Sequence, residues 1–203
     1  MKKSEFAIIE AFMLECPVDV AHDCNHVYRV LGNAVDIARH EGGVDMDILI
    51  AACLLHDIGR PRQYADSSLC HAQVGAEMAY EFLVNHNWSE ERANHVRSCI
   101  TTHRYRKNNK PASIEAKILF DADKLEVAGA VGIARTILYD GQTGGGIDGF
   151  IYEYNFKLKH IYDRFYTARG KKLAKERQKT AVDFYNGLIG ETELNDKNGY
   201  LED

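Results

Sequence analysis

The stretch Ile48-Leu49-Ile50-Ala51-Ala52-Cys53-Leu54-Leu55-His56-Asp57-Ile58-Gly59 decides how this chain folds and where its chemistry lies. Its apolar first part predicts a buried helix, with an imidazole and a carboxylate side by side at the helix end. A buried carboxylate without a partner is costly, and a divalent cation compensates its charge at little cost. We therefore expect His56 and Asp57 to belong to a metal site.

Size and composition predict one folded domain. The chain has 203 residues, of which 45% are hydrophobic, so it can bury a substantial core. We expect residues 1–190 to form a single helical domain and residues 191–203 to form a polar C-terminal tail. The formal net charge of −5 argues against a partner that is a nucleic acid.

The same sequence predicts a cytoplasmic protein without a membrane partner. No segment approaches the roughly 20 apolar residues that a membrane span requires. Glu5, Glu10 and Glu15 interrupt any signal-peptide core. The five cysteines include no C-x-x-C pair, which indicates reduced thiols rather than disulfides or a thiolate zinc site.

Helical periodicity and capping residues predict an all-α protein. Loops are expected at residues 60–70 and in the glycine-rich stretch 141–149. The predicted helices are 4–15 with Ser4 as cap, 20–40 capped by Asp19, 45–57 opened by Asp45, 71–85, 89–103 capped by Ser89, 113–139 capped by Ser113, 150–168 and 171–189.

Further ligand-type residues lie on other predicted helices. His22 and His26 are four residues apart and share one helix face. Asp121 and Asp123 lie in an apolar run and point about 200° apart, so only one of them can reach a given ion directly. The spacing alone leaves open whether Asp121 or Asp123 is the ligand, and the other one is expected to be a cap or to support a ligand.

Two neutral imidazoles with two carboxylates form a nitrogen and oxygen ligand set that suits Mn, Fe, Co, Ni, Zn or Mg. A bound water whose pKa falls from about 16 toward about 7 becomes a nucleophile at neutral pH. Basic side chains around the site favour a phosphorus ester or anhydride as the electrophile. Most of these side chains are nevertheless expected to lie on a solvent-exposed face without a role in the site. Lys124 is the exception, because it neighbours a predicted ligand. The cations are Arg29, Arg60, Arg62, Arg104, Arg106, Lys107 and Lys124.

The order of His26, His56-Asp57 and Asp123 resembles the HD superfamily of metal-dependent phosphohydrolases. Residues 21–30, 54–59 and 121–125 resemble three motifs of that family, in which the aspartate before a basic residue and a leucine is the usual ligand. This resemblance favours Asp123. It covers about residues 20–190 and extends to a bacterial subfamily that is similar to nucleotide pyrophosphohydrolases.

The resemblance implies an all-helical bundle with a five- or six-helix core and extra C-terminal helices. It also implies a divalent metal ion and a nucleotide substrate, a nucleoside triphosphate that metal-bound water splits to monophosphate and pyrophosphate. We expect Asp57 and His22 to assist proton transfer, and Lys124 and Arg29 to hold phosphate oxygens. The expected metal ligands are His26, His56, Asp57 and Asp123.

Three alternatives stay open at this point. His71 and His103 either contact phosphate and line the cleft, which we prefer, or hold a second metal, as in cyclic-dinucleotide phosphodiesterases and di-iron oxygenases of this superfamily. A nucleotide-binding sensor without catalysis is the third interpretation. A homodimer through the C-terminal helices is compatible with the sequence if Phe165, Tyr166 and Phe184 are partly exposed.

Overall fold

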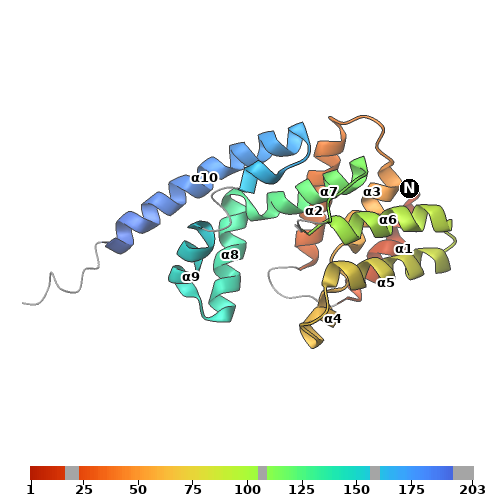
Figure 1. Cartoon of the computed structure of the whole chain (residues 1–203), viewed down its shortest axis with the longest axis horizontal. Helices are drawn as coiled ribbons and strands as arrows, with labels where there is room; N and C mark the ends of the chain where they lie inside the picture. The colour runs from red at the N-terminus through yellow and green to blue at the C-terminus, as the bar shows by residue number, and fades with distance from the viewer. Residues whose placement is uncertain (17–22, 105–108, 156–160, 194–203) are drawn as a thin grey trace, which may run out of the picture.

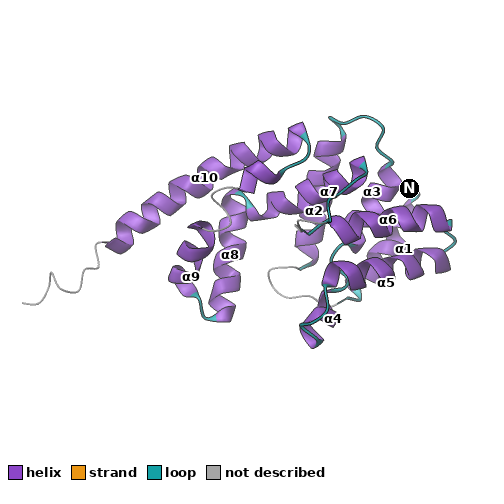
Figure 2. Ribbon diagram, in the orientation of Figure 1, coloured by secondary structure: helices purple, strands orange, loops and turns teal. Residues whose placement is uncertain are grey.

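The computed structural model describes residues 1–16, 23–104, 109–155 and 161–193, and these ranges contain helices and no strand (Figures 1 and 2). The predicted all-α class is confirmed. The bundle consists of α1 (Lys3–Leu14), α2 (Cys24–Ala38), α3 (Met46–Leu55), α4 (Arg60–Ala65), α5 (His71–Asn85), α6 (Glu90–Thr102) and α7 (Ile114–Lys124). It is followed by the 3₁₀ helix η2 (Leu125–Val127), α8 (Gly129–Thr143), α9 (Gly146–Glu153), the 3₁₀ helix η4 (Ile161–Arg164) and α10 (Ala168–Glu193).

Helix α3 is the centre of the bundle. Its residues from Ile48 to Leu55 are buried, except for the half-buried Ile50. A helix that is apolar on all sides must be surrounded by other elements, and α3 contacts α1, α2, α5, α6 and α7. The end of α3 therefore delivers His56 and Asp57 into the interior of the protein.

Side-chain caps fix where several helices begin. The predicted cap of the second helix, Asp19, lies outside the described residues, and α2 begins only at Cys24. Ser4 is not a cap, because α1 begins at Lys3 without a side-chain cap. The side chains that accept a hydrogen bond from a first-turn backbone N–H are Asp23, Asp45, Ser89 and Ser113, which confirms the last three predictions.

The prediction of a loop at residues 60–70 is wrong for its first half, because residues Arg60–Ala65 form α4. Pro61 lies in the first helical turn, where its missing N–H costs nothing. The helix packs closely against α5, because a Cβ on Gly59 would lie only 2.2 Å from the backbone oxygen of His71. Only glycine permits this close approach, which places the side chains of α4 beside the end of α3.

The single helix predicted for residues 113–139 is also wrong, because the chain bends between α7 and α8. The backbone of Gly129, the first residue of α8, has a φ of 69°. This left-handed conformation lies outside the range of a regular α-helix, so α7 and α8 cannot be one continuous helix. Arg177 of α10 donates a 3.2 Å hydrogen bond to the carbonyl of Leu125, which satisfies an oxygen near the break. This bend lets α8 leave the bundle in a new direction.

Helices α8, α9 and α10 lie together at one side of the bundle (Figure 1). The glycine-rich loop predicted at 141–149 is reduced to a short turn, in which Gly144 adopts a φ of 83°. The helix predicted at 150–168 is wrong, because α9 ends at Glu153 and α10 begins at Ala168. Helix α10 extends to Glu193, and nearly all of the tail predicted at residues 191–203 lies outside the described residues.

Two predictions about side chains have different outcomes. Phe165 is 4% exposed, which contradicts the exposure expected of it, whereas Tyr166 and Phe184 are 37% and 41% exposed. All five cysteines are free thiols, as expected. None of the helices in the described ranges has the length and apolar character that a membrane span needs.

Candidate metal centre

Six ligand-type side chains from five helices or helix ends meet beside the end of α3. His56 directly follows α3, His71 is the first residue of α5, and His103 directly follows α6. The four histidines and Asp57 are at most 2% exposed, and the side chain of Asp123 is 14% exposed. The set is His26, His56, Asp57, His71, His103 and Asp123.

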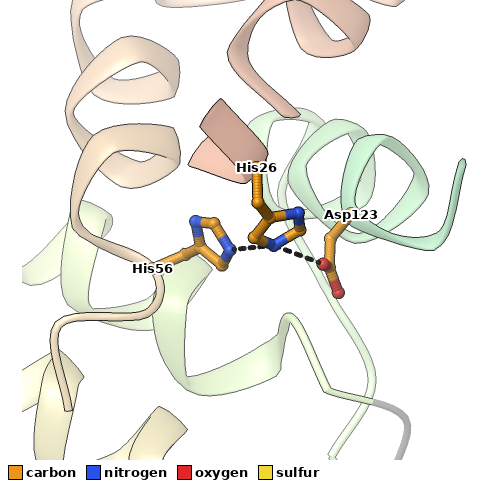
Figure 3. A group of neighbouring side chains, drawn as sticks. All are labelled: His26, His56 and Asp123. Atoms are coloured by element: carbon orange, nitrogen blue, oxygen red, sulfur yellow. Dashed lines mark hydrogen bonds and ion pairs between the residues drawn. The ribbon is translucent and has the colours of Figure 1, made fainter. Parts of the chain in front are cut away.

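His26, His56 and Asp123 form the first group (Figure 3). The Nε2 atom of His26 lies 3.4 Å from Nε2 of His56 and 3.6 Å from Oδ1 of Asp123. Two ligand atoms that bind one ion with bonds of about 2.1 Å at a tetrahedral angle lie about 3.4 Å apart. The spacing of this group therefore fits a shared ion.

Asp57 faces this first group and a second one. Its Oδ2 lies 3.4 Å from Nε2 of His56 and 3.6 Å from Nε2 of His26. Its Oδ1 lies 3.6 Å from Nε2 of His71 and 3.7 Å from Nε2 of His103. Asp57, His71 and His103 form the second group that has the spacing of a metal site.

Backbone carbonyls orient two of the four imidazoles. The Nδ1 of His56 lies 2.8 Å from the carbonyl oxygen of Cys53, and that of His103 lies 2.6 Å from the carbonyl oxygen of Ile100. A carbonyl oxygen can only accept, so Nδ1 carries the proton in both rings. In the neutral form of each ring the unprotonated Nε2 faces the centre, and this is the form that binds a metal.

Side chains from other elements orient the remaining two imidazoles. The Nδ1 of His71 contacts the amide oxygen of Gln63, which belongs to α4. The Nδ1 of His26 lies 3.4 Å from Oε2 of Glu126, which belongs to η2. With Nδ1 as the donor in each pair, these rings also direct a free Nε2 toward the centre.

The electrostatics of the site suit a bound cation. Burial lowers the pKa of His71 to about 2 and that of His103 to about 4, so both rings are neutral at physiological pH. Burial opposes ionisation of Asp57, but His56 and Arg60 outweigh it and hold the pKa of this carboxyl well below its usual value. The Nε of Arg60 lies 2.6 Å from Oδ2 of Asp57, whereas Oδ1 accepts no hydrogen bond from the residues that the structure describes.

This ligand set therefore fits a divalent ion. The buried Oδ1 of Asp57, which has no hydrogen-bond donor among the described residues, and the inward-facing imidazole nitrogens are the kind of partners that such an ion requires. A nitrogen and oxygen set without thiolate is compatible with Mn, Mg, Fe, Co, Ni or Zn.

The structure separates Asp121 from Asp123. Asp121 accepts hydrogen bonds of 2.8 Å from the backbone N of Tyr166 and of 2.7 Å from the backbone N of Thr167. The hydroxyl of Thr167 also donates to it. Asp121 thus anchors the chain just before α10, and Asp123 is the aspartate that lies beside the histidines.

The remaining predicted site residues lie at the edge of the centre. The Nζ of Lys124 is 2.9 Å from Oδ2 of Asp123, and its side chain is 21% exposed. The Nε of Arg29 lies 2.7 Å from Oε2 of Glu126, so its charge is shared with a buried carboxylate. His22 lies outside the described residues.

Gln63 and Glu126 are neighbours of the site that were not predicted. Arg60 was one of the cations predicted around the site, and its side chain is 16% exposed with its Nε 2.6 Å from Oδ2 of Asp57. Gln63 and Glu126 hold histidines. Spacing in the sequence could have indicated two of these contacts. Arg60 follows Asp57 by three residues, and Glu126 follows Asp123 by three residues. Side chains at this spacing lie on the same face of a helix.

An apolar cavity borders the centre on the side of α1. It has a volume of about 200 Å³ and Asp57 forms part of its wall. Ligand sites that enclose a whole organic molecule are larger, at roughly 300–1,000 Å³. The cavity therefore has the size and character of a subsite for one apolar group. Its apolar lining includes Met13, Leu14, Cys24, Val27, Leu54 and Ile58.

Comparisons with known proteins agree with this geometry. A sequence model described as the HD domain matches residues 24–128. An uncharacterised protein of Bacillus subtilis, YpgQ, is 34% identical over 175 residues, which is 82% of each chain.

Solved structures extend the likeness to the whole fold. The crystal structure of B. subtilis YpgQ in complex with ADP has a TM-score of 0.76 at 28% identity, covering 92% of this chain and 97% of that chain. A predicted HD superfamily hydrolase from an uncultured Thermotogales bacterium has a TM-score of 0.67 at 31% identity, covering 93% and 92%. An HD-superfamily hydrolase from Bacillus thuringiensis has a TM-score of 0.72 at 28% identity, covering 95% and 99%.

Proposed function

The chain belongs to the HD domain family, and on this premise we propose that it is a divalent-metal phosphohydrolase acting on a nucleotide. The proposed reaction is hydrolysis of a nucleoside triphosphate to the monophosphate and pyrophosphate. The observation that carries the proposal is the meeting of two imidazoles and two carboxylates from three helical segments at one buried point. The proposed metal ligands are His26, His56, Asp57 and Asp123.

A divalent ion held there supplies Lewis acidity toward phosphoryl oxygens and a nucleophilic water at neutral pH. The chain's own residues position the substrate. Lys124 lies beside Asp123 and is partly exposed, so its ammonium group can contact a phosphate oxygen and stabilise the charge that develops there. Asp57 is ionised, so its carboxylate can assist proton transfer by accepting a hydrogen bond from the attacking water and orienting it.

Two observations favour a nucleotide over other phosphate compounds. The related YpgQ was crystallised with ADP, a nucleotide. The apolar cavity beside Asp57 suits a nucleobase, because a planar ring system gains from burial against apolar side chains. In this arrangement the phosphates lie at the metal centre and the base lies against Leu54 and Ile58.

A substrate screen tests this function. Purified protein, stripped with chelator, is reloaded with Mn, Mg, Co or Ni and offered nucleoside triphosphates, cyclic nucleotides and phosphomonoesters. We expect monophosphate and pyrophosphate from triphosphates, only with added metal, and no product from His56→Ala. Binding of nucleotides without turnover under every metal would instead identify a nucleotide sensor.

A second candidate function has its own observation. His71 and His103 both direct Nε2 at Oδ1 of Asp57, at 3.6 and 3.7 Å. Two lone-pair atoms that face each other at this distance repel unless a cation lies between them. This geometry favours a second ion, as a two-metal phosphodiesterase or a di-iron oxygenase on this scaffold would require. Turnover of a cyclic nucleotide, or oxygen uptake by the iron-loaded protein, would distinguish these activities in the same screen.

A further inference from the structure

The imidazole of His26 lies between two carboxylates that are only three residues apart in the chain. Its Nε2 is 3.6 Å from Oδ1 of Asp123, and its Nδ1 is 3.4 Å from Oε2 of Glu126. Asp123 belongs to the last turn of α7, and Glu126 to η2. We propose that Glu126 is a positioning residue, which holds His26 in the orientation and tautomer that bind a divalent ion.

The Nδ1 of His26 faces a different kind of partner from the Nδ1 of His56 and of His103. His56 and His103 each use the carbonyl three residues earlier, whereas the corresponding carbonyl for His26 belongs to Asp23. That carbonyl and the Asp23 side chain both accept from the backbone N of His26 at the start of α2. The Nδ1 of His26 instead faces a carboxylate from another element, Oε2 of Glu126 at 3.4 Å.

Glu126 is built into the site as a charged group. It is 1% exposed, and a buried carboxylate is retained only where opposite charge and hydrogen bonds compensate it. Arg29 supplies an Nε at 2.7 Å from Oε2, and Arg135 places an Nη1 at 3.9 Å from the same oxygen. Arg135 also donates a 3.1 Å hydrogen bond to the backbone oxygen of Glu126. These contacts hold the carboxylate against His26.

The bend after η2 secures this placement. Arg177 bonds the carbonyl of Leu125 and the side-chain oxygen of Asn33, which ties η2 to α10 and α2. A Cβ on Gly129 would lie 2.8 Å from the Cβ of Arg177, so the bend and α10 fit closely. The segment that carries Asp123 and Glu126 is thus held in place, with one carboxylate beside each ring nitrogen of His26.

Metal affinity in the absence of substrate tests the proposal, which rests on the metal site of the proposed function. Stripped wild type, Glu126→Gln and Glu126→Leu are titrated with Mn²⁺ by calorimetry. The glutamine keeps an acceptor for Nδ1 but loses the charge, so we expect affinity to fall about 10-fold, and about 100-fold in the leucine variant. Glu115→Gln is the matched control, because it makes the same substitution at a buried glutamate of α7 that accepts a hydrogen bond from the backbone N of Asp45 and is not part of the centre, and its affinity should stay within about 3-fold.

A second measurement does not depend on metal or turnover. The ¹⁵N shifts of the His26 imidazole in stripped protein report which nitrogen carries the proton. We expect the Nδ1–H tautomer in wild type and in Glu126→Gln, and a mixture of tautomers in Glu126→Leu. An unchanged tautomer with unchanged Mn²⁺ affinity in Glu126→Leu would overturn the role of Glu126. Failure of wild type to hydrolyse any nucleotide, with the tautomer shift present, would overturn only the proposed function.

Discussion

Arg60 lies directly against Asp57, with its Nε 2.6 Å from the carboxylate oxygen Oδ2. This oxygen also faces His26 and His56, so a permanent positive charge and the first ligand group share one oxygen. Arg60 reaches this position because α4 begins immediately after Gly59. The ion pair is therefore part of the centre and stabilises the ionised carboxylate.

Arg60→Gln should destabilise the protein more without a divalent ion than with one. Removing one partner of a largely buried ion pair costs about 3 kcal/mol of unfolding free energy, because the carboxylate is left without its compensating charge. An added ion supplies positive charge to the same carboxylate and should recover part of this loss. Urea unfolding in EDTA and in Mn²⁺ measures both values, and an equal loss in the two conditions would contradict the shared role of Oδ2.

His56→Ala and Asp57→Ala should each abolish metal-dependent hydrolysis. Loss of a group that only supports a ligand costs up to about 100-fold, so loss of a ligand itself should cost more. We expect the far-UV circular dichroism spectrum to stay helical, because α3 is held by its apolar residues rather than by its end. Turnover at the wild-type rate in either folded variant would remove the hydrolase proposal.

Asp121→Ala and Asp123→Ala should separate stability from metal binding. Asp121 accepts three hydrogen bonds from Tyr166 and Thr167, so its loss leaves buried donors unsatisfied and should cost about 3 kcal/mol of unfolding free energy. Its metal content should remain that of wild type. Asp123→Ala should give the opposite result, with little change in urea midpoint in EDTA and a loss of bound metal. The reverse pattern would assign the ligand role to Asp121.

His103→Ala should lower the number of ions bound per chain. If Oδ1 of Asp57 shares a second ion with His71 and His103, wild type should bind two Mn²⁺ at saturation and the variant one. Equilibrium dialysis with elemental analysis counts the ions. The control is Thr101→Ala, two residues earlier in the last turn of α6, which should keep the wild-type number. A single ion in wild type would favour contact of His71 and His103 with phosphate instead.

Gly59→Ala should destabilise the fold, whereas Gly32→Ala should not. A Cβ at Gly59 would lie 2.2 Å from the backbone oxygen of His71 and 2.5 Å from the backbone N of Gly75, so α4 and α5 would have to separate. We expect a loss of about 3 kcal/mol in unfolding free energy, together with weaker metal binding through displaced His71. At Gly32, within α2, a Cβ meets nothing within 4 Å, and alanine should add roughly 0.5–1 kcal/mol of stability. Thermal unfolding of both variants checks the contrast.

The sequence was informative wherever local chemistry decides the outcome. The apolar stretch before His56 predicted a central helix, and Asp45, Ser89 and Ser113 predicted three helix starts, because periodicity and capping act over a few residues. The predictions were wrong where a proline fits the start of a helix and where a glycine permits a sharp bend. The chain therefore forms α4 at Pro61 and breaks the predicted long helix near Gly129.

The sequence also shows the order of the ligand-type residues. This order resembles that of the HD superfamily, and the chain does belong to the HD domain family. What they do together depends on distances between helices that are far apart in the chain. The tertiary structure shows that Asp121 holds the chain just before α10 by hydrogen bonds. It also places the Asp57 carboxylate between two groups of histidines. It also brought Glu126 to His26 across one hundred positions, because only the packing of α2 against η2 sets that distance.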